Sequence, residues 1–97
     1  MLGSMKKPIK SPSAREIFCT NLRLVRRLKE MSQEELGFRS DLSRTYVSEV
    51  ERGTRNISID NMGMLAQALD VPLRDLVDPK MFIGLGKSRR EVNDIKS

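Results

Sequence analysis

Residues 44–52 combine side chains that can exchange hydrogen bonds with the edges of nucleic acid bases. At about 100° per residue of helix, Thr45, Ser48 and Glu49 share one side, with Arg44 at the N-terminal tip and Arg52 beside them. Arginine can bind guanine O6 and N7 together, threonine offers a hydroxyl and a methyl group, and glutamate can accept from cytosine N4. The segment therefore predicts a helix that reads DNA bases.

Each of these residues also has a simpler interpretation, and both stay open on the sequence alone. Arg44 can neutralise a phosphate without reading a base. Glu49 can keep the face soluble or repel wrong sequences. The ring of Tyr46 lies on the flank of the same helix, where it can touch the sugar–phosphate backbone or a thymine methyl, or simply cover the rim of the core.

Phosphate contacts need donors beside the reading helix. Gln33 lies in the first turn of the preceding helix, where free backbone N–H groups and the side-chain amide can clamp one phosphate. Arg55 and Asn56 follow the reading helix and can hold the next stretch of backbone, and Arg55 can also reach a base or the minor groove. An ordinary polar loop is the alternative for Arg55 and Asn56.

Two short helices are needed to position these groups, and the first of them begins after Ser32. Ser32 is a good N-cap, and Glu35 three residues later predicts a capping box. Leu36 is the apolar anchor of this helix, which we expect over about 33–39. A polar break follows it.

The second helix is expected over 44–52. Ser43 caps its start, Val47 and Val50 share its apolar face, and Gly53 is a natural stop. Two short helices joined by a turn of about three or four residues are the anatomy of a helix-turn-helix, which lays its second helix in the DNA major groove.

Three further helices complete an all-α, compact five-helix bundle. Phe18, Leu22 and Val25 follow the 3.6-residue period and predict a helix from Ser13 or Ala14 to Glu30. Ser58 caps the fourth helix. Its expected buried stripe is Ile59, Met62, Leu65, Ala66 and Leu69. A short fifth helix is expected over Leu73–Val77, closed by Asp78-Pro79.

Charge and composition divide the chain into a flexible basic N-terminal arm (1–13), a domain (14–79) and a C-terminal tail (80–97). Residues 1–30 hold eight basic and two acidic side chains, for a net charge of +6, whereas residues 31–79 hold five and nine, for −4. The tail carries +3. The total of +5 favours a polyanionic partner, although basic tails can also serve solubility alone.

Composition argues against catalysis and against cofactors. The chain has no histidine and one cysteine, Cys19, so a zinc site would lack ligands and an internal disulfide would lack its second cysteine. No Gly-rich phosphate loop, Ser- or Cys-centred triad or membrane-length apolar run is present. A free cysteine is more often a small buried residue of the core than a redox sensor, and we expect the same of Cys19. We expect a soluble cytoplasmic protein that is not an enzyme and has no cofactor, metal or small-molecule ligand.

Glu51 is unusual because it falls on the inward side of its helix, beside Val47 and Val50. A buried carboxylate needs a partner, because an isolated buried charge is costly. Arg26, next to the expected core residue Val25, is the candidate. Such a pair would fix the angle between two helices and would be structural.

The residues above keep a joint spacing that is highly specific. They are Phe18, Leu22, Val25-Arg26, Ser32-Gln33-Glu34-Glu35-Leu36, Leu42-Ser43, Val47-Ser48, Val50-Glu51-Arg52-Gly53, Asn56 and Ala66-Gln67-Ala68-Leu69-Asp70-Val71. With this spacing, residues 18–77 resemble the Cro/CI-type (XRE-like) helix-turn-helix family of phage repressors and small bacterial regulators, whose fold is lambda-repressor-like. The string from Arg44 to Ser58 looks most like the controller proteins of restriction–modification systems.

The resemblance implies a homodimeric transcriptional regulator, as controller proteins are small homodimers that bind operators. It implies base or phosphate contacts at Gln33, Arg44, Thr45, Tyr46, Glu49 and Arg55, and the Arg26–Glu51 pair. It also implies dimerisation through the last two helices. We expect the dimer interface at Met62, Leu73, Leu76, Val77 and Phe82.

Three positions depart from the family pattern. Gly37 replaces the usual alanine at the contact between the two helices of the motif, where it fits sterically but costs about 1 kcal/mol of helix propensity. Asp41 replaces the usual turn glycine, a position that tends to need positive φ, which Asp tolerates better than most residues. Glu30 stands where glycine often ends the first helix.

Two functions from different classes fit these features. The leading one is a sequence-specific regulator of transcription that binds double-stranded DNA as a homodimer on a pseudo-palindromic operator. The alternative is an antitoxin or co-regulator that binds another protein through the tail and the apolar cluster Met81–Leu85. Acidic residues such as Glu34, Glu35 or Asp41 are candidates for contacting RNA polymerase, although solvated charge is the default interpretation.

Overall fold

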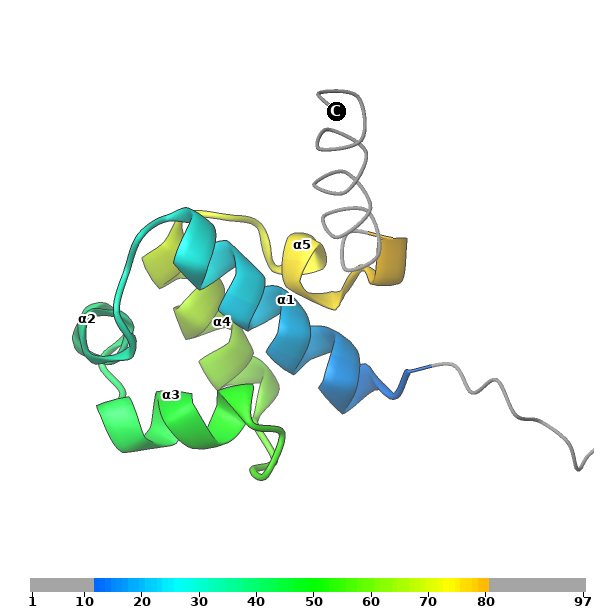
Figure 1. Cartoon of the computed structure of the whole chain (residues 1–97), viewed down its shortest axis with the longest axis horizontal. Helices are drawn as coiled ribbons and strands as arrows, with labels where there is room; N and C mark the ends of the chain where they lie inside the picture. Colours follow the sequence, from blue (N-terminus) through cyan, green and yellow to red (C-terminus); the bar gives the residue numbers. More distant parts are fainter. Residues whose placement is uncertain (1–11, 81–97) are drawn as a thin grey trace, which may run out of the picture.

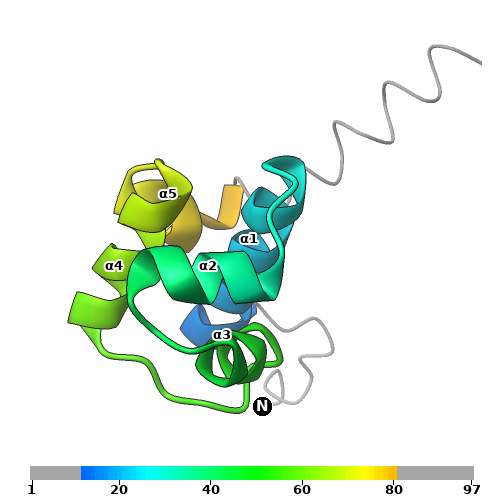
Figure 2. The same cartoon turned by 90° about the vertical axis from the view of Figure 1, so that its left-hand side faces the viewer.

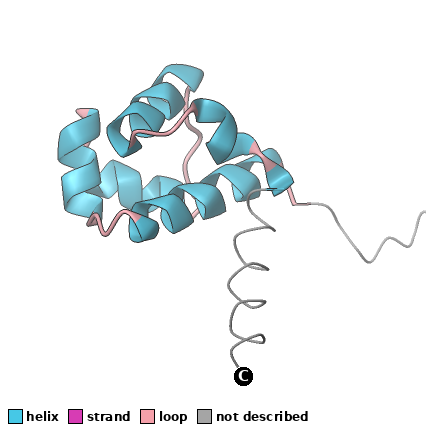
Figure 3. Ribbon diagram, turned by 90° about the horizontal axis from the view of Figure 1, so that it is seen from above, coloured by secondary structure: helices cyan, strands magenta, loops and turns pink. Residues whose placement is uncertain are grey.

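The computed structural model describes residues 12–80, and within them every regular element is a helix (Figure 3). The elements are α1 (Ala14–Leu28), α2 (Gln33–Ser40), α3 (Arg44–Glu51), α4 (Ile59–Leu69) and α5 (Leu73–Val77). The predicted all-α, five-helix fold is confirmed. None of these helices is both long and apolar enough to cross a membrane.

The helices pack around one shared core. Helix α1 packs on α3 and α5, α2 packs on α3 and α4, and α4 packs on α5. Figure 1 shows α2 end-on and α3 running across the view, and Figure 2 shows the reverse, so these two helices cross at a steep angle; in Figure 1, α1 passes in front of α4. The core residues are Phe18, Leu22, Val25, Leu36, Val47, Val50, Leu65, Ala66, Leu69 and Leu76.

Serine side chains begin four of the helices. Ser13, Ser32, Ser43 and Ser58 each accept a hydrogen bond from the backbone N–H three residues later. These bonds satisfy donors that the helix itself leaves free. The caps at Ser32, Ser43 and Ser58 are therefore confirmed.

The predicted capping box at Ser32 is only half present. The Ser32 hydroxyl accepts from the Glu35 N–H, but the Glu35 carboxylate turns along the helix to Arg39, 2.7 Å away. A full capping box occurs instead at α1, between Ser13 and Glu16. An arginine one turn ahead competes with the cap for the Glu35 carboxylate, since residues i and i+4 are neighbours on a helix.

Residues with a left-handed (αL) backbone conformation lie just after the ends of three helices. Asp41 and Asp70 are the C-caps of α2 and α4, with φ of 63° and 61°. The positive φ expected at Asp41 is confirmed. Glu30 has φ of 56°, which explains why α1 ends at Leu28 rather than at Glu30 as predicted. An αL residue cannot continue a right-handed helix.

The predicted buried stripe of α4 is wrong at one position. Ile59 is 66% exposed, whereas Leu65, Ala66 and Leu69 are buried and Met62 is half-buried. Ile59 is the first residue of α4, and the first buried residue of this helix is Leu65. Periodicity gives the face of a residue but not how far along the helix the core extends.

Gly37 lets α2 approach the start of α3 closely. A β-carbon built at Gly37 would lie 2.9 Å from the Ser43 carbonyl carbon and 2.9 Å from the Arg44 amide nitrogen. Both atoms belong to the backbone, so they cannot move aside as a flexible side chain would. The close crossing places the N-terminus of α3 against α2.

Gly37→Ala is therefore expected to destabilise the protein despite the better helix propensity of alanine. Overpacking of about 1–3 kcal/mol exceeds the propensity gain of about 1 kcal/mol, leaving a net loss of about 1 kcal/mol. Urea unfolding measured at equilibrium checks this. Gly63→Ala on α4 is the matched control, because nothing lies within 4 Å of its added β-carbon. A Gly37→Ala protein as stable as the control variant would contradict the prediction.

Candidate nucleic-acid interface

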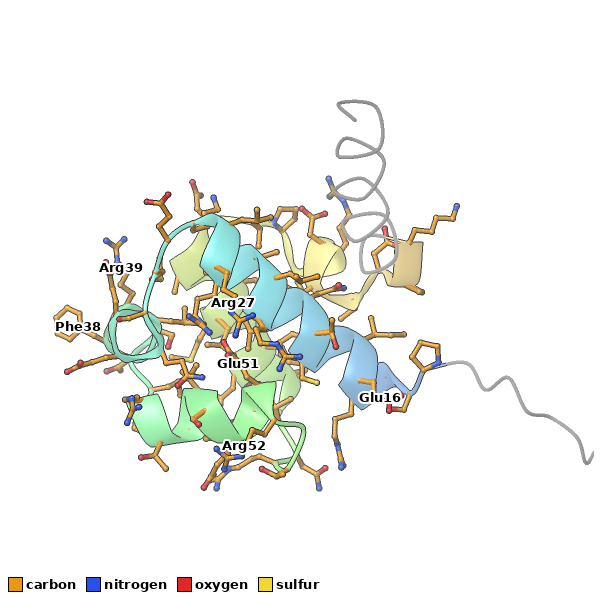
Figure 4. The ribbon with its side chains drawn as sticks, in the orientation of Figure 1. Glu16, Arg27, Phe38, Arg39, Glu51 and Arg52 are labelled. Carbon is orange, nitrogen blue, oxygen red and sulfur yellow. The ribbon has the colours of Figure 1, made fainter. Side chains whose placement is uncertain are left out.

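Helix α3 divides its residues between the core and the surface as its period predicts. Val47, Val50 and Glu51 are buried. The residues on the opposite side are exposed or half-buried: Arg44, Thr45, Ser48, Glu49 and Arg52. In Figure 4, Glu51 lies between α1 and α3 while Arg52 points away from the core.

The orientation of α3 is held by an ion pair beneath it. Arg26 Nε donates to Glu51 Oε2 at 2.6 Å, and Arg26 Nη2 donates to Glu51 Oε1 at 3.0 Å. Both side chains are almost fully buried, with 11% and 2% of their surfaces exposed. This bidentate geometry is the one that compensates best for taking two charges out of water. Arg26, the expected partner of Glu51, is thus in direct contact with it.

Three further hydrogen bonds extend this network, two from arginine side chains and one from the amide of a glutamine. Arg26 Nη1 donates to the Met31 carbonyl at 2.9 Å, and Arg23 Nη1 donates to the Glu51 carbonyl at 3.1 Å, near the end of α3. Gln33 Nε2 donates to Glu51 Oε1 at 3.0 Å. The Gln33 amide, expected to clamp a phosphate, is therefore bonded to Glu51.

Arg44 and Thr45 stand at the exposed N-terminal end of α3. Their side chains form no hydrogen bond or ion pair with any other residue in the range 12–80. The backbone beneath them is fixed by the Ser43 cap, whose hydroxyl accepts from the Tyr46 N–H at 3.0 Å. A rigid backbone with unengaged donor groups suits a surface that binds a partner.

Other expected contact residues are engaged with one another. Glu49 Oε1, one candidate acceptor for a base, accepts from Arg55 Nη1 at 2.9 Å. The Arg55 guanidinium also lies over the Tyr46 ring, 4.8 Å from its centroid. Arg52 Nη1 donates to Ser48 Oγ at 2.8 Å, one turn back along α3.

Two residues at this face were missed by sequence reasoning. Arg15 in the first turn of α1 donates to the side chain of Asn56 in the loop after α3. Asn61 in the first turn of α4 donates to the Tyr46 hydroxyl at 3.0 Å. Neither residue lies in the motif, and only the packing of α1 and α4 brings them to it. A basic residue at a helix start, where the dipole disfavours it, was the one available signal for Arg15.

The expected dimer surface is corrected at one residue. Leu76 is fully buried, because the face of α5 that carries it packs against α1. The Asn21 amide on α1 also donates to the Leu76 carbonyl at 3.2 Å. Val77 is 42% exposed, and Met62 and Leu73 are half-buried. Phe82 and the cluster Met81–Leu85 lie outside the described residues.

Comparison with known proteins identifies the class. The family model described as Helix-turn-helix matches residues 22–76. The chain therefore belongs to the helix-turn-helix family, of the Cro/CI (XRE) type that the sequence predicted.

Within this class, the relatives include controllers of restriction–modification. The control protein C.BamHI of Bacillus amyloliquefaciens is 49% identical over 65 residues, which cover 66% of this chain and 80% of that protein. The crystal structure of the restriction–modification controller protein C.AhdI of Aeromonas hydrophila superimposes with a TM-score of 0.62 at 48% identity, covering 64% and 90%. The tetramer of C.Esp1396I, in complex with its 35-base-pair operator, gives 0.64 at 31% identity, covering 76% and 95%.

Proposed function

We propose that the protein is a sequence-specific transcriptional regulator that binds double-stranded DNA as a homodimer on a pseudo-palindromic operator. The observation that carries the proposal is the exposed tip of α3, where the side chains of Arg44 and Thr45 have no partner within residues 12–80, on a helix held in place by the buried Arg26–Glu51 pair. In a helix-turn-helix, this end of the second helix meets base edges in the major groove. Relatives named as controller proteins support the same role.

The roles of the individual side chains follow from their places. Arg44 and Thr45 read base edges, and Tyr46 with Arg55 contacts the adjoining bases or backbone. Ser48, Glu49 and Arg52 line the same face. Phosphates are held by the N-terminal turn of α2, which begins at Gln33, and by Asn56.

We place the dimer interface on the outer side of α4 and α5. Met62, Leu73 and Val77 are the apolar residues that a second copy would cover. Two copies of α3 would then meet successive major grooves about 34 Å apart. A restriction–modification controller is the regulator type that the relatives favour.

Residues 14–79 form the DNA-binding domain, and the basic segments 1–13 and 80–97 add sequence-independent attraction to DNA. The protein acts in the cytoplasm, by binding rather than by catalysis. The acidic residues that are candidates for contacting RNA polymerase are Glu34 and Asp41, which are exposed, and Glu35, which is half-buried.

Selection of bound duplexes from a random DNA pool tests the proposal, with the mass of the protein measured in solution. We expect a two-fold-symmetric consensus, with half-sites about one helical turn apart, bound by a dimer. Enrichment of no sequence, with only salt-sensitive general binding, would contradict it.

A further inference from the structure

Tyr46 is held from the side of α4. Its hydroxyl oxygen accepts a hydrogen bond from Asn61 Nδ2 at 3.0 Å, and the bond is partly buried. Asn61 is placed by the start of α4, where its own backbone N–H donates to the Ser58 cap at 3.1 Å. A short side chain on a capped turn has little freedom, so the Tyr46 hydroxyl is tied to a rigid point outside the reading helix.

The direction of this bond leaves the Tyr46 proton free. A phenol is one donor as well as an acceptor, and Asn61 uses its acceptor side. No group within residues 12–80 accepts a hydrogen bond from this hydroxyl. The Tyr46 O–H is therefore available to donate to an acceptor on DNA, such as a phosphate oxygen or guanine N7.

The fixed ring in turn supports Arg55. The guanidinium lies 4.8 Å from the ring centroid and 2.9 Å from Glu49 Oε1, so it is held between a π-face and a carboxylate. The loop that carries Arg55 is tied to α3 as well. Thr54 donates to the Glu49 carbonyl through its backbone N–H at 3.1 Å and its hydroxyl at 3.2 Å. About half of the Arg55 side chain stays exposed, which leaves it accessible to DNA.

We propose that Asn61 is a positioning residue for sequence recognition. By donating to the Tyr46 hydroxyl it sets the ring that supports Arg55 and turns the Tyr46 proton toward the DNA. Because Tyr46 and Arg55 are held in place before DNA binds, they lose less conformational freedom on binding and adapt less well to a wrong base. The inference rests on the proposed function, and it assigns to α4 a part in base discrimination.

The test compares the affinity for a duplex selected from the random pool with the affinity for a scrambled duplex of equal length. Asn61→Ala is expected to lower this specificity ratio about threefold to tenfold, the size typical of coupled contacts. In a Tyr46→Phe background the same change is expected to have no further effect, because the hydroxyl is gone. Gln67→Ala is the matched control, since it removes an exposed amide from the same helix.

Asn61→Asp is a second variant that keeps the fold. An acidic residue suits the first turn of a helix, but a carboxylate only accepts and draws the Tyr46 proton toward α4. We expect the specificity ratio to fall at least as far as in Asn61→Ala. The added charge weakens binding to both duplexes and cancels in the ratio.

A large wild-type ratio that stays unchanged in both Asn61 variants would overturn the inference, even if their thermal midpoints fell, because Asn61 would then serve stability alone. An Asn61→Ala effect that persists in full with Tyr46→Phe would also overturn it. A wild-type ratio near one would overturn the proposed function itself, and this inference with it.

Discussion

Glu51→Ala is expected to lower the free energy of unfolding by about 3–5 kcal/mol, the usual cost of breaking a buried ion pair. The guanidinium of Arg26 would remain buried with its carboxylate gone, and Gln33 would lose its acceptor as well. The thermal midpoint should fall by at least about 12 °C, at about 4 °C per kcal/mol for a domain of this size. Thermal unfolding followed by circular dichroism measures it.

Two variants separate the buried pair from charge in general. Glu35→Ala breaks the exposed pair with Arg39 and should change stability by less than about 1 kcal/mol. The double change Arg26→Met with Glu51→Leu removes both charges and should recover much of the loss, since apolar residues of similar volume often replace buried pairs well. An unchanged midpoint in Glu51→Ala would show that the pair does not hold α3 in place.

Arg44→Ala is expected to weaken binding to the selected operator by about 1–3 kcal/mol, or about fivefold to 150-fold, and to leave binding to scrambled DNA much less affected. The reason is that Arg44 is exposed at the tip of α3 with no partner in the described chain, so its full hydrogen-bonding capacity is available to a base. Fluorescence anisotropy with both duplexes measures the two affinities.

A phosphate contact would give a different pattern. An arginine that only neutralises a phosphate would weaken both duplexes equally and would reduce the salt slope by about one. Arg39→Ala serves as the control, because Arg39 is an exposed arginine that pairs with Glu35 on α2. Equal losses on both duplexes after Arg44→Ala would contradict the assignment of Arg44 to base reading.

The parts of the fold that depend on local periodicity could be predicted from the sequence. Serine caps before apolar runs located the helix starts to within a residue, because a cap and its helix lie within four residues of each other. The 3.6-residue period likewise predicted that Glu51 faces inward on α3. Its contact with Arg26 was predictable because a buried carboxylate needs a cation and few were near the core.

The contacts made through tertiary packing could not be predicted. Tyr46 and Asn61 are 15 positions apart, and Arg15 and Asn56 are 41 apart, so only the placement of whole helices brings them together. The Glu49–Arg55 pair depends on a loop that turns back after Gly53, whose φ is +75°. Hence the residues of α3 could be assigned to a face, but the partners that hold them there could not.

The error at Leu76 has a related cause. Helix α5 has five residues, little more than one turn, so no apolar stripe repeats along it. Leu73, Leu76 and Val77 looked equally suited to a dimer surface, and only the packing of α5 on α1 separated the buried Leu76 from the exposed Val77. Short helices gain their inner face from their neighbours rather than from their own pattern.

Methylation interference on the selected duplex tests most directly whether α3 reads bases in the major groove. Methylation of guanine N7 blocks the major groove, whereas methylation of adenine N3 blocks the minor groove. We predict that N7 methylation abolishes binding in two symmetric patches about one helical turn apart. Interference confined to adenine N3, or none at either position, would contradict the account.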